Sequence, residues 1–439
     1  MNRNNNSTGP REIALTVLSQ ILEEGGYNNI ALKNALSKYN DTDPRDRAMV
    51  TELVNGTLRN LIYIDYIIAA HSKAPAKKMF IKNLLRMSVY QLMFMDRVPE
   101  SAVCNEAVEL AKKKGMGGLS GYVNGLLRSI ARAKGSIALP DKEKDFEEYL
   151  SVVYSHPKWL VKYWLSFMNK TEAESLCAGG NTAPVVTLSV NTTKITAERL
   201  INILTAEGVA ASYSDHENTL KVKGSGNLQN LESFKAGYYH VMDINAVKAM
   251  DLISPKPGER VLDLCASPGG KSFYAAALMK NKGEILSLDI HEHKLKLIEE
   301  GAERLGFSIT ETGRNDAAIF NAAYEDKWNK VILDAPCSGF GVLSKKPDAR
   351  YKKTMGDVLA LAKLQRDMLS AAHKYPKPGG RLLYCTCTIS VKENEENISW
   401  FLQNYPYEAE GEFRGGALAG TIGDGFYAVS LRRISLEPV

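Results

Sequence analysis

Apolar residues recur at helical spacing through roughly the first third of the chain. Segments such as 11–26, 63–72 and 81–95 place hydrophobic side chains three or four residues apart, with polar residues between them. This period is typical of amphipathic helices whose apolar faces meet in a common core. The pattern therefore predicts an all-α bundle from about residue 10 to residue 132.

The pattern changes after the linker AKGSIALPDKEKD, which ends at residue 145. VVTLSVN at residues 185–191 alternates like a half-buried strand, and residues 195–208 read as a helix that stops at Gly208. These segments predict a small α+β unit over residues 145–237, although the periodicity alone indicates no function for it.

From residue 238 onwards, strand-like and helix-like runs alternate. The strand-like runs are VLDLCA, EILSLDI, KVILDAP and RLLYCTC, and each is followed by a helical pattern. This alternation predicts a parallel, doubly wound, Rossmann-like α/β sheet, whose ligands lie beyond the C-terminal strand ends. We therefore expect a multidomain chain with an all-α domain (1–134), a small α+β unit (145–237) and an α/β domain (238–439).

A glycine-rich turn follows the first of these strands, in VLDLCASPGGKS. A Walker A loop requires glycine where Cys265 stands, and the G-x-G-x-x-G dinucleotide motif is absent. Asp263 lies inside the strand, and Asp289 ends the next strand, where its carboxylate can accept hydrogen bonds from ribose hydroxyls. This pair suggests S-adenosylmethionine, although the turn taken alone fits a purely structural strand–turn–helix equally well.

The composition is ordinary for a soluble protein, with 44% hydrophobic and 24% charged residues. No apolar run approaches a membrane span, and the polar start MNRNNNSTGP lacks the core of a signal peptide, so we expect a cytoplasmic protein without membrane contact. The six cysteines form neither a disulfide framework nor a C-x-x-C zinc pair, and we expect reduced thiols and no metal.

The positive charge gathers at the front of the chain. Residues 1–140 carry about 19 Lys and Arg against about 12 Asp and Glu, whereas the whole chain has a net charge of +5. Lysines cluster at residues 73–82 and again at 112–114. Either run is explained by a solvated helix face or by a surface that meets nucleic-acid phosphates.

Several motifs together resemble a known family. VLDLCASPGGKS, ILDAPCSGFGV and YCTCTISVKENEENI, with DGFYAVSLRR near the end, resemble the RsmB (Sun/Fmu, NOL1/NOP2) family of RNA cytosine-5 methyltransferases. NEAVELAKK and YVNGLLR resemble the RNA-binding domain of the antitermination factor NusB, over about the first 130 residues. The resemblance implies a NusB-like front domain and a class I methyltransferase domain.

The resemblance also implies a substrate and a site. It implies methylation of a cytosine in 16S ribosomal RNA, unassembled or partly assembled, by a monomer that uses S-adenosylmethionine. The family's nucleophile falls on Cys387 and its product-release cysteine on Cys337, with Asp334 and Lys271 beside them. Its cofactor-binding positions fall on Cys265, Ala266, Ser267, Pro268, Gly269, Gly270, Lys271, Asp289, Asp316 and Asp334.

The chemistry explains why such residues are needed. Carbon 5 of cytosine becomes nucleophilic enough to take a methyl group when a thiolate adds to carbon 6. The resemblance assigns that thiolate to Cys387 and the later removal of the carbon 5 proton to Cys337. Lone cysteines are more often buried filler, and we interpret Cys104, Cys177 and Cys385 in that way. The target base is expected to be single-stranded, bulged or flipped out.

Some positions depart from the family pattern. Ser267 replaces an alanine of the turn, Thr388 replaces the serine after the nucleophile, and Ser189 replaces an arginine of the middle unit. The last change removes a cation from the middle unit. Two alternatives stay open from the sequence: the same reaction on transfer RNA, or a non-catalytic NusB-like RNA-binding protein.

Overall fold

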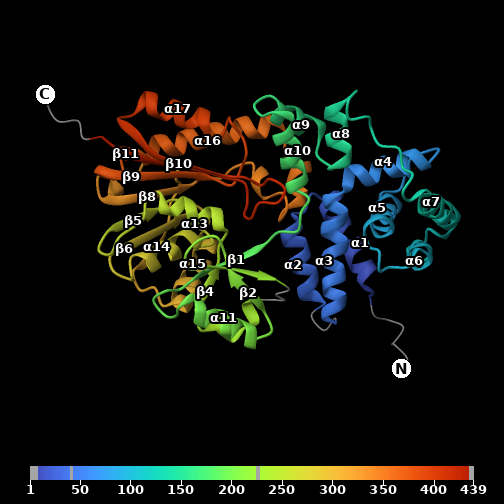
Figure 1. Ribbon diagram of the computed structural model, residues 1–439, viewed down its shortest axis with the longest axis horizontal. Coiled ribbons are helices and arrows are strands. Elements are labelled where there is room, and N and C mark those ends of the chain that lie inside the picture. The colour runs from blue at the N-terminus through green and yellow to red at the C-terminus, as the bar shows by residue number, and fades with distance from the viewer. Residues whose placement is uncertain (1–7, 40–42, 224–227, 435–439) are drawn as a thin grey trace. The chain divides into compact units, whose positions relative to one another are not determined.

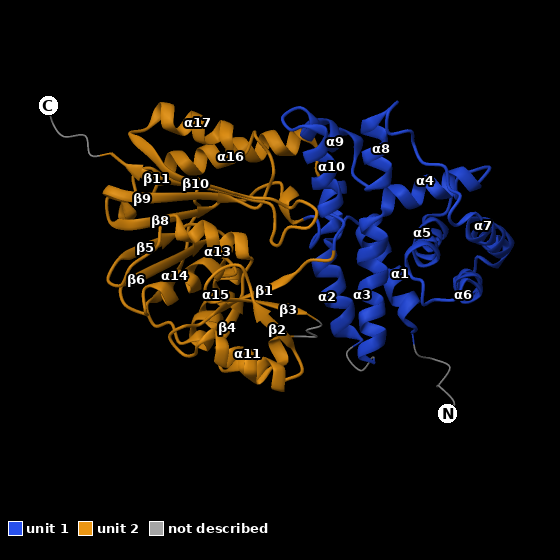
Figure 2. Cartoon of the chain, in the orientation of Figure 1, with its two compact units in different colours: residues 1–182, 343–352 blue, residues 183–342, 353–439 orange. Residues whose placement is uncertain are grey.

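The computed structural model describes residues 8–39, 43–223 and 228–434. The chain forms two compact units, shown in different colours in Figure 2. Unit 1 comprises residues 1–182 and 343–352, and unit 2 comprises residues 183–342 and 353–439. The ten residues 343–352 therefore interrupt the sequence of unit 2 but pack with unit 1.

Unit 1 is all α, as the helical spacing predicts (Figure 1). Its first seven helices share one apolar core, in which Leu18, Leu53 and Leu84 are fully buried. These helices are α1 (Pro10–Leu22), α2 (Asn28–Lys38), α3 (Pro44–Arg59), α4 (Leu61–His71), α5 (Met79–Phe94), α6 (Glu100–Lys113) and α7 (Ser120–Ala133).

Three further helices and the segment 343–352 complete unit 1. The helices are α8 (Phe146–Val153), α9 (Lys158–Leu165) and α10 (Lys170–Gly179). Arg350 is fully buried, and its guanidinium donates hydrogen bonds to Gly180 O at 3.0 Å, Ser155 O at 3.1 Å and Asn181 Oδ1 at 2.8 Å. A buried guanidinium needs such acceptors, so the segment is fixed to the end of α10 by specific contacts.

Unit 2 begins with a small antiparallel sheet, which confirms the predicted α+β unit. Its strand order is β2-β3-β1-β4, and α11 (Ala197–Ala206) and α12 (Glu232–Lys235) cover one face. Leu188, Leu200 and Leu220 are fully buried between that sheet face and α11. The strands are β1 (Val186–Val190), β2 (Ala210–Tyr213), β3 (Thr219–Lys223) and β4 (Tyr239–Val241).

The larger sheet of unit 2 has seven strands in the order β10-β11-β9-β8-β5-β6-β7. The five strands from β9 to β7 are parallel, which confirms the predicted Rossmann-like α/β domain. The strands are β5 (Arg260–Asp263), β6 (Glu284–Asp289), β7 (Thr310–Arg314), β8 (Trp328–Asp334), β9 (Pro376–Thr386), β10 (Tyr407–Gly415) and β11 (Phe426–Arg433).

Helices cover both faces of this sheet (Figure 1). One apolar cluster joins Val261 and Ile285 to the helices on one face, and another joins Leu262 and Leu333 to those on the other face. Neighbouring residues of β5 thus point to opposite faces, as in a sheet buried on both sides. The first face carries α13 (Ile244–Asp251), α14 (Gly270–Leu278) and α15 (Glu292–Leu305), and the second carries α16 (Met355–Ala372) and α17 (Glu395–Asn404).

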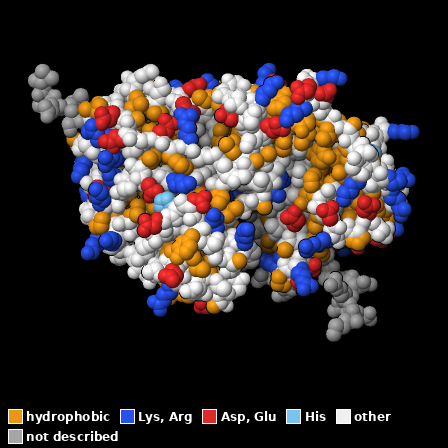
Figure 3. Space-filling view, in the orientation of Figure 1, with side chains coloured by type: hydrophobic (Ala, Val, Ile, Leu, Met, Phe, Trp, Pro, Cys, Tyr) orange, Lys and Arg blue, Asp and Glu red, His pale blue; other side chains and the backbone are white. Residues whose placement is uncertain are grey.

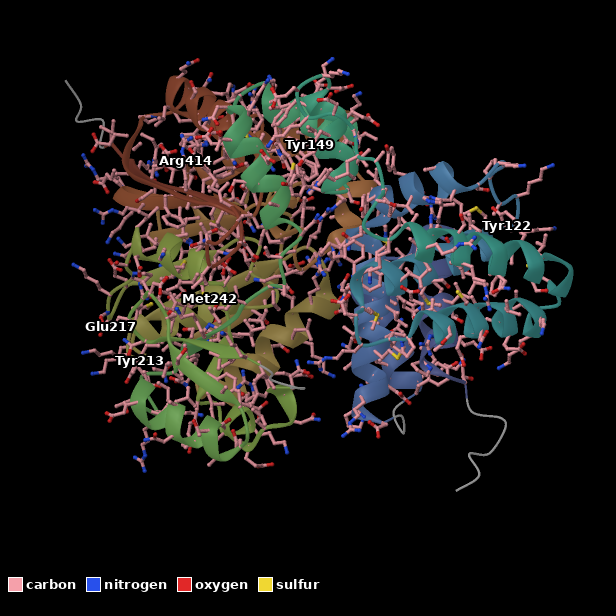
Figure 4. All side chains as sticks on the ribbon, turned by 45° about the vertical axis from the view of Figure 1, so that its right-hand side comes forward. Tyr122, Tyr149, Tyr213, Glu217, Met242 and Arg414 are labelled. Carbon is pink, nitrogen blue, oxygen red and sulfur yellow. The ribbon has the colours of Figure 1, made fainter. Side chains whose placement is uncertain are left out.

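The sheet ends in an antiparallel hairpin that the predicted purely parallel sheet does not include. β11 pairs antiparallel with both β9 and β10, so it lies inside the sheet although it comes last in sequence. β10 is the edge strand, where Arg414, labelled in Figure 4, forms an ion pair with Glu395 at 2.8 Å. The sheet is therefore mixed, with one antiparallel edge.

The compact units divide the chain differently from the three expected domains. Helices α8 to α10 fall in the expected middle domain, 145–237, but they pack within unit 1. Leu160 and Trp164 of α9 are fully buried there, and Arg350 binds the end of α10. Within the described residues, no helix is long and apolar enough to cross a membrane.

Candidate active site

The glycine-rich turn connects β5 to α14 at the C-terminal edge of the large sheet. Gly269 has a φ of 106°, and a Cβ there would come within 2.4 Å of the Phe273 ring. Both the backbone conformation and the steric contact therefore favour glycine at this position. A Cβ at Gly270 would meet no atom within 4 Å. The turn over Cys265, Ala266, Ser267 and Pro268 thus leads to an open helix N-terminus.

Asp263 is a buried carboxyl group at the base of this turn. Ser272 Oγ donates to Asp263 Oδ2 at 2.8 Å, and Ser287 Oγ donates in turn to Ser272 Oγ. Asp263 Oδ1 is buried and has no hydrogen-bond partner among the described residues. Burial raises the pKa of Asp263 to about 7. An orphaned buried acceptor next to an open turn suits a ligand that brings a cationic donor, such as the α-ammonium group of S-adenosylmethionine.

Asp289 and Asp316 follow the next two strands. Asp289 ends β6 and is 7% exposed, and its Oδ1 accepts a hydrogen bond from His291 N at 2.9 Å. Asp316 lies two residues beyond β7, where its Oδ1 accepts from Ala318 N at 3.0 Å. With Phe320 and neighbouring residues it lines a cavity of about 410 Å³. Both acids therefore lie along the edge at which α/β sheets bind ligands.

Lys271 and Asp334 form a close ion pair beside the turn. Lys271 Nζ lies 2.5 Å from Asp334 Oδ2, and the Cys385 thiol lies 3.6 Å from Asp334 Oδ1. Burial opposes the charge on Lys271, but the Asp334 carboxylate outweighs it and raises the pKa of the lysine. Lys271 thus stays protonated and fixes the direction of the carboxylate at the end of β8.

The structure brings Cys337 and Cys387 together although 50 residues separate them. Their Sγ atoms lie 3.4 Å apart, and both side chains are partly exposed. Each cysteine follows the end of one of the adjacent parallel strands β8 and β9. The hydrogen bond with Cys387 and burial raise the pKa of Cys337. Two thiols this close do not readily ionise together, because their charges repel each other.

A buried polar cluster lies behind the two thiols, and the sequence analysis did not find it. Glu393 is fully buried and binds Ser338, the residue after Cys337. Thr388, the residue after Cys387, binds Ser338 Oγ. Asn394 binds the residues on both sides of Cys387. The available signal was a run of polar residues, ENEEN, at the start of the helix that follows a buried strand.

The remaining cysteines differ from this pair. Cys104, Cys177 and Cys385 are buried, as expected for cysteines that fill a core. In residues 8–39, 43–223 and 228–434 there is no cluster of three or more histidine, cysteine or acidic side chains able to hold a metal ion.

Family models match three separate stretches of the chain. Residues 250–414 match the description "16S rRNA methyltransferase RsmB/F" and residues 8–132 match "NusB family". Residues 156–229 match "Methyltr_RsmF/B-like, ferredoxin-like domain". These matches agree with an all-α front end, a small α+β unit and a mostly parallel sheet.

Whole-chain relatives carry closely similar names. "Probable ribosomal RNA small subunit methyltransferase B" of Bacillus subtilis is 38% identical over 91% of this chain and 89% of that protein. "Ribosomal RNA small subunit methyltransferase B" of Proteus mirabilis is 30% identical over 95% of this chain and 97% of that protein.

Two solved structures have a similar fold. The crystal structure of PH0851 covers 98% of this chain and 100% of its own, with 27% identity and a TM-score of 0.80. NSun6 from Pyrococcus horikoshii, solved with SFG, covers 64% of this chain and 98% of its own, with 23% identity and a TM-score of 0.58.

The fold and the edge of the large sheet define an RNA methyltransferase with a Rossmann-like catalytic domain and a NusB-like helical domain. A ribosomal RNA small subunit methyltransferase that is 38% identical over 91% of the chain identifies the family within this class. The chain belongs to the RsmB/F family of 16S ribosomal RNA methyltransferases. Membership confirms the expected cofactor, S-adenosylmethionine, and disfavours a non-catalytic NusB-like protein.

Proposed function

We propose that the chain methylates carbon 5 of a cytosine in 16S ribosomal RNA through a covalent bond between Cys387 and carbon 6. The observation that carries the proposal is the 3.4 Å separation of the Cys337 and Cys387 Sγ atoms. Both thiols follow strands at the same sheet edge as the glycine-rich turn. One base placed at this edge is thus within reach of a nucleophile and of a second proton-transfer group.

The reaction divides between the two cysteines. The Cys387 thiolate adds to carbon 6 of the cytosine, and the displaced π electrons make carbon 5 nucleophilic. Bound S-adenosylmethionine supplies the methyl group as an electrophilic sulfonium. Cys337, as a thiolate, then removes the carbon 5 proton. The electrons of that C–H bond restore the ring double bond and expel Cys387 as a thiolate.

Asp334 and Lys271 orient the base in this proposal. The Asp334 carboxylate stands at the end of β8, three residues before Cys337, and Lys271 holds it through their 2.5 Å contact. A carboxylate fixed in this way accepts a hydrogen bond from the exocyclic amino group of cytosine. Lys271 therefore acts through Asp334, and the 2.5 Å contact supports this role over an effect on a thiol.

The cofactor-binding residues are proposed on the same grounds. Residues 265–271 form the open turn, and the orphaned Asp263 Oδ1 suits the cationic methionine end of the cofactor. Asp289, at the end of the second parallel strand, suits the ribose hydroxyls. Asp316 lines the cavity of about 410 Å³ beyond β7, and we assign it to the base of the cofactor.

Two cysteine variants test the mechanism. Each is incubated with substrate RNA and S-adenosylmethionine and run on a denaturing gel. Cys387→Ala removes the attacking sulfur, so we expect neither a covalent RNA adduct nor 5-methylcytidine. Cys337→Ala keeps the attack and the methyl transfer but slows proton removal, so we expect a shifted enzyme–RNA band to accumulate.

Cys104→Ala is the matched control, because Cys104 is buried in α6 and loses only packing contacts. It is expected to methylate RNA without an accumulated adduct. A shifted band from Cys387→Ala and none from Cys337→Ala would reverse the two roles. Full activity in both variants would exclude the covalent mechanism.

The RNA class is tested in cells. Bisulfite sequencing of total RNA from a deletion strain and its parent locates every 5-methylcytidine that depends on this gene. We expect one lost signal in 16S ribosomal RNA, with unassembled or partly assembled subunits as the substrate. A loss confined to transfer RNA would assign the reaction to the alternative substrate.

A further inference from the structure

Glu393 is a buried acid behind the two cysteines, with no part in the proposed chemistry so far. It is fully buried, and its Oε1 accepts from Ser338 N at 2.8 Å and from Gln365 Nε2 at 3.1 Å. Its Oε2 accepts from Ser338 Oγ at 2.5 Å. These donors are a backbone amide, an amide side chain and a hydroxyl, so the charge of the acid is solvated by neutral groups.

The same cluster reaches the second cysteine through one shared hydroxyl. Ser338 Oγ lies 2.6 Å from Thr388 Oγ1, and Thr388 follows Cys387 directly in the chain. Asn394 Nδ2 donates to Thr388 O at 3.0 Å, and Asn394 Oδ1 accepts from Thr386 Oγ1 at 2.7 Å. The residues on both sides of Cys387 are thus tied to the start of α17, Thr386 through its hydroxyl and Thr388 through its carbonyl. The backbone after Cys337 is tied to Glu393.

The arrangement is not symmetrical with respect to the two thiols. The Glu393 carboxylate binds the Cys337 loop directly through two atoms of Ser338 and reaches Thr388 through the Ser338 hydroxyl, whereas the Glu393 backbone N donates to Ser390 O at 3.1 Å. The Glu393 carboxylate is therefore hydrogen-bonded directly to the residue that follows Cys337. The opposite side of the edge carries Asp334, whose charge is paired with Lys271.

We propose that Glu393 is a positioning residue that holds the two cysteine loops in register and keeps Cys337 protonated, so that Cys387 is the thiol that ionises first. This inference rests on the proposed cytosine-5 mechanism, in which Cys387 must attack before Cys337 acts as a base. It deepens that mechanism by naming what sets the order.

The electrostatic reason is direct. Two thiols 3.4 Å apart share one favourable ionisation, and a nearby fixed negative charge disfavours ionisation of the thiol closest to it. The Cys387 thiol, burial, Glu393 and Asp334 together raise the pKa of Cys337. Once the Cys387 sulfur is bonded to carbon 6, it no longer repels a charge on Cys337. Cys337 then loses its proton to solvent and becomes the base.

The test separates charge from shape with three variants. Glu393→Gln removes the charge and keeps the side-chain length, whereas Ser338→Ala keeps the charge and breaks the hydroxyl link between the loops. Glu396→Gln is the matched control: the same substitution, three residues away, on a carboxylate that is 41% exposed and paired with Lys392. All are studied in the full-length chain.

The first readout requires neither RNA nor cofactor. Each protein is treated briefly with iodoacetamide between pH 6 and pH 9, and mass spectrometry gives the extent of alkylation at Cys387 and Cys337. In the wild type and in Glu396→Gln we expect Cys387 to react first. In Glu393→Gln we expect the ratio of Cys387 to Cys337 alkylation to fall by about tenfold, the effect of about one unit in relative pKa.

The second readout is steady-state methylation. Glu393→Gln and Ser338→Ala are expected to lower kcat by at least about tenfold with KM for RNA and cofactor unchanged, since both side chains are buried behind the cysteines. Ser338→Ala is expected to keep the wild-type alkylation ratio, because it keeps the charge. An unchanged alkylation ratio in folded Glu393→Gln would overturn the proposal. So would wild-type kcat in that variant.

The failure of the underlying mechanism has a different signature. If the product is not 5-methylcytidine but the alkylation ratio shifts as expected, Glu393 still sets the ionisation order and only the cytosine-5 assignment fails. If 5-methylcytidine and the Cys387 adduct form but the ratio does not shift, the mechanism stands and the role of Glu393 fails.

Should Glu393→Gln not fold, Glu393→Asp replaces it. The carboxylate then withdraws by one methylene, and an unchanged ratio together with unchanged kcat would again overturn the proposal.

Discussion

Asp263, Asp334 and Glu393 are carboxyl groups at one edge of the large sheet, and each has different surroundings. Asp263 has one hydroxyl donor and one orphaned oxygen, Asp334 has a lysine, and Glu393 has neutral donors only. The chemistry of a carboxyl group follows from such partners rather than from its residue type. Each acid therefore has its own expected response to substitution.

Asp263 makes the stability of the cofactor-free protein depend on pH. Burial raises its pKa to about 7 in the folded chain, compared with about 3.9 when unfolded. The folded state therefore holds a proton that the unfolded state has lost between about pH 4 and pH 7. The stability that Asp263 contributes is fully present below about pH 4 and is lost as the pH rises through about 7.

Asp263→Asn imitates the protonated acid and removes this loss. We expect the melting temperature of the wild type to fall more between pH 5 and pH 8 than that of Asp263→Asn. The corresponding difference in the change of unfolding free energy is of order 2–4 kcal/mol. Asp367→Asn, at a half-exposed surface acid of α16, is the control and should keep the wild-type pH dependence. Parallel curves for wild type and Asp263→Asn would show that Asp263 stays ionised.

Asp289→Ala tests the cofactor assignment. The carboxylate is 7% exposed at the end of β6, so a ligand that hydrogen-bonds to it forms a charge-assisted bond in a partly dry site. We expect calorimetry to show S-adenosylmethionine binding weakened about 10- to 100-fold, the loss of roughly 1.5–3 kcal/mol. Asp367→Ala should bind as the wild type does. Equal affinities in all three proteins would contradict the assignment of Asp289 to the ribose hydroxyls of the cofactor.

At the residue scale, candidate site residues could be singled out from the sequence where a residue type carries its own chemistry. The thiols at Cys337 and Cys387 stood out because each follows a strand-like run, and the structure places their sulfurs 3.4 Å apart. Glu393 and Asn394 gave no such signal, since acids and amides are common at the start of helices. Their burial comes from the contact between two loops, which the sequence does not show.

At the scale of elements, the strands in the middle of the sheet were easier to predict than its antiparallel edge. β5 and β8 are buried on both faces and read as apolar runs. β10, by contrast, is an edge strand with mostly exposed polar residues. β11 is buried but pairs with strands on both sides only because the hairpin folds back into the sheet. That return depends on tertiary packing rather than on local pattern.

The start of α13 is expected to hold the loop before β11. Asp243 caps the helix by accepting from Asn245 N at 3.0 Å, and its two oxygens also accept from Asp424 N at 3.1 and 3.2 Å. Met242, labelled in Figure 4, directly precedes this cap. Asp243→Ala removes both functions, so we expect a loss of about 1–2 kcal/mol for the cap alone, and more in total.

Urea unfolding followed by circular dichroism measures this loss. Thr354→Ala is the comparison, because Thr354 caps α16 in an exposed capping box without a long-range contact. We expect Asp243→Ala to lower the unfolding midpoint more than Thr354→Ala does. A smaller effect from Asp243→Ala would mean that the loop is held by other contacts.

At the scale of the whole molecule, the charge of the NusB-like domain is not equally available for RNA. Lys73, Lys77 and Lys78 are exposed and have no ion pair in the part of the chain that the structure describes. Lys112 and Lys113, by contrast, form ion pairs with Glu109 and Glu12. On the face shown in Figure 3, basic side chains are scattered among acidic ones, so no single basic patch stands out.

Lysine variants test which charges meet phosphates. Replacing Lys73, Lys77 and Lys78 with alanine should weaken RNA binding and reduce the slope of log affinity against log salt by about 2, because each phosphate contact contributes roughly 0.7 on single strands. Replacing Lys112 and Lys113 should change the slope less, since both are already neutralised by acids. Equal slopes in the wild type and the triple variant would place the RNA on another surface. Cofactor affinity should be unchanged throughout.

Deleting residues 1–134, a simpler test of the same domain, removes more than the lysines expected to meet RNA. The Tyr351 hydroxyl donates a hydrogen bond to Leu58 O at 2.8 Å, and the Asn28 backbone N donates to Asp348 Oδ2 at 3.1 Å. The deletion leaves these partners exposed on the segment 343–352. The sequence could not predict that residues 343–352 belong to unit 1, because a ten-residue pattern does not indicate which core it joins.

The segment 343–352 also determines which chimeras of two related genes can fold. A recombination event that exchanges only the first 182 codons between two related genes gives a hybrid whose helical unit contains ten residues from the other parent, among them the fully buried Arg350. The two stretches of gene must therefore change together, although about 160 codons lie between them. We expect chimeras that also exchange codons 343–352 to yield more folded protein than chimeras that exchange the first 182 alone.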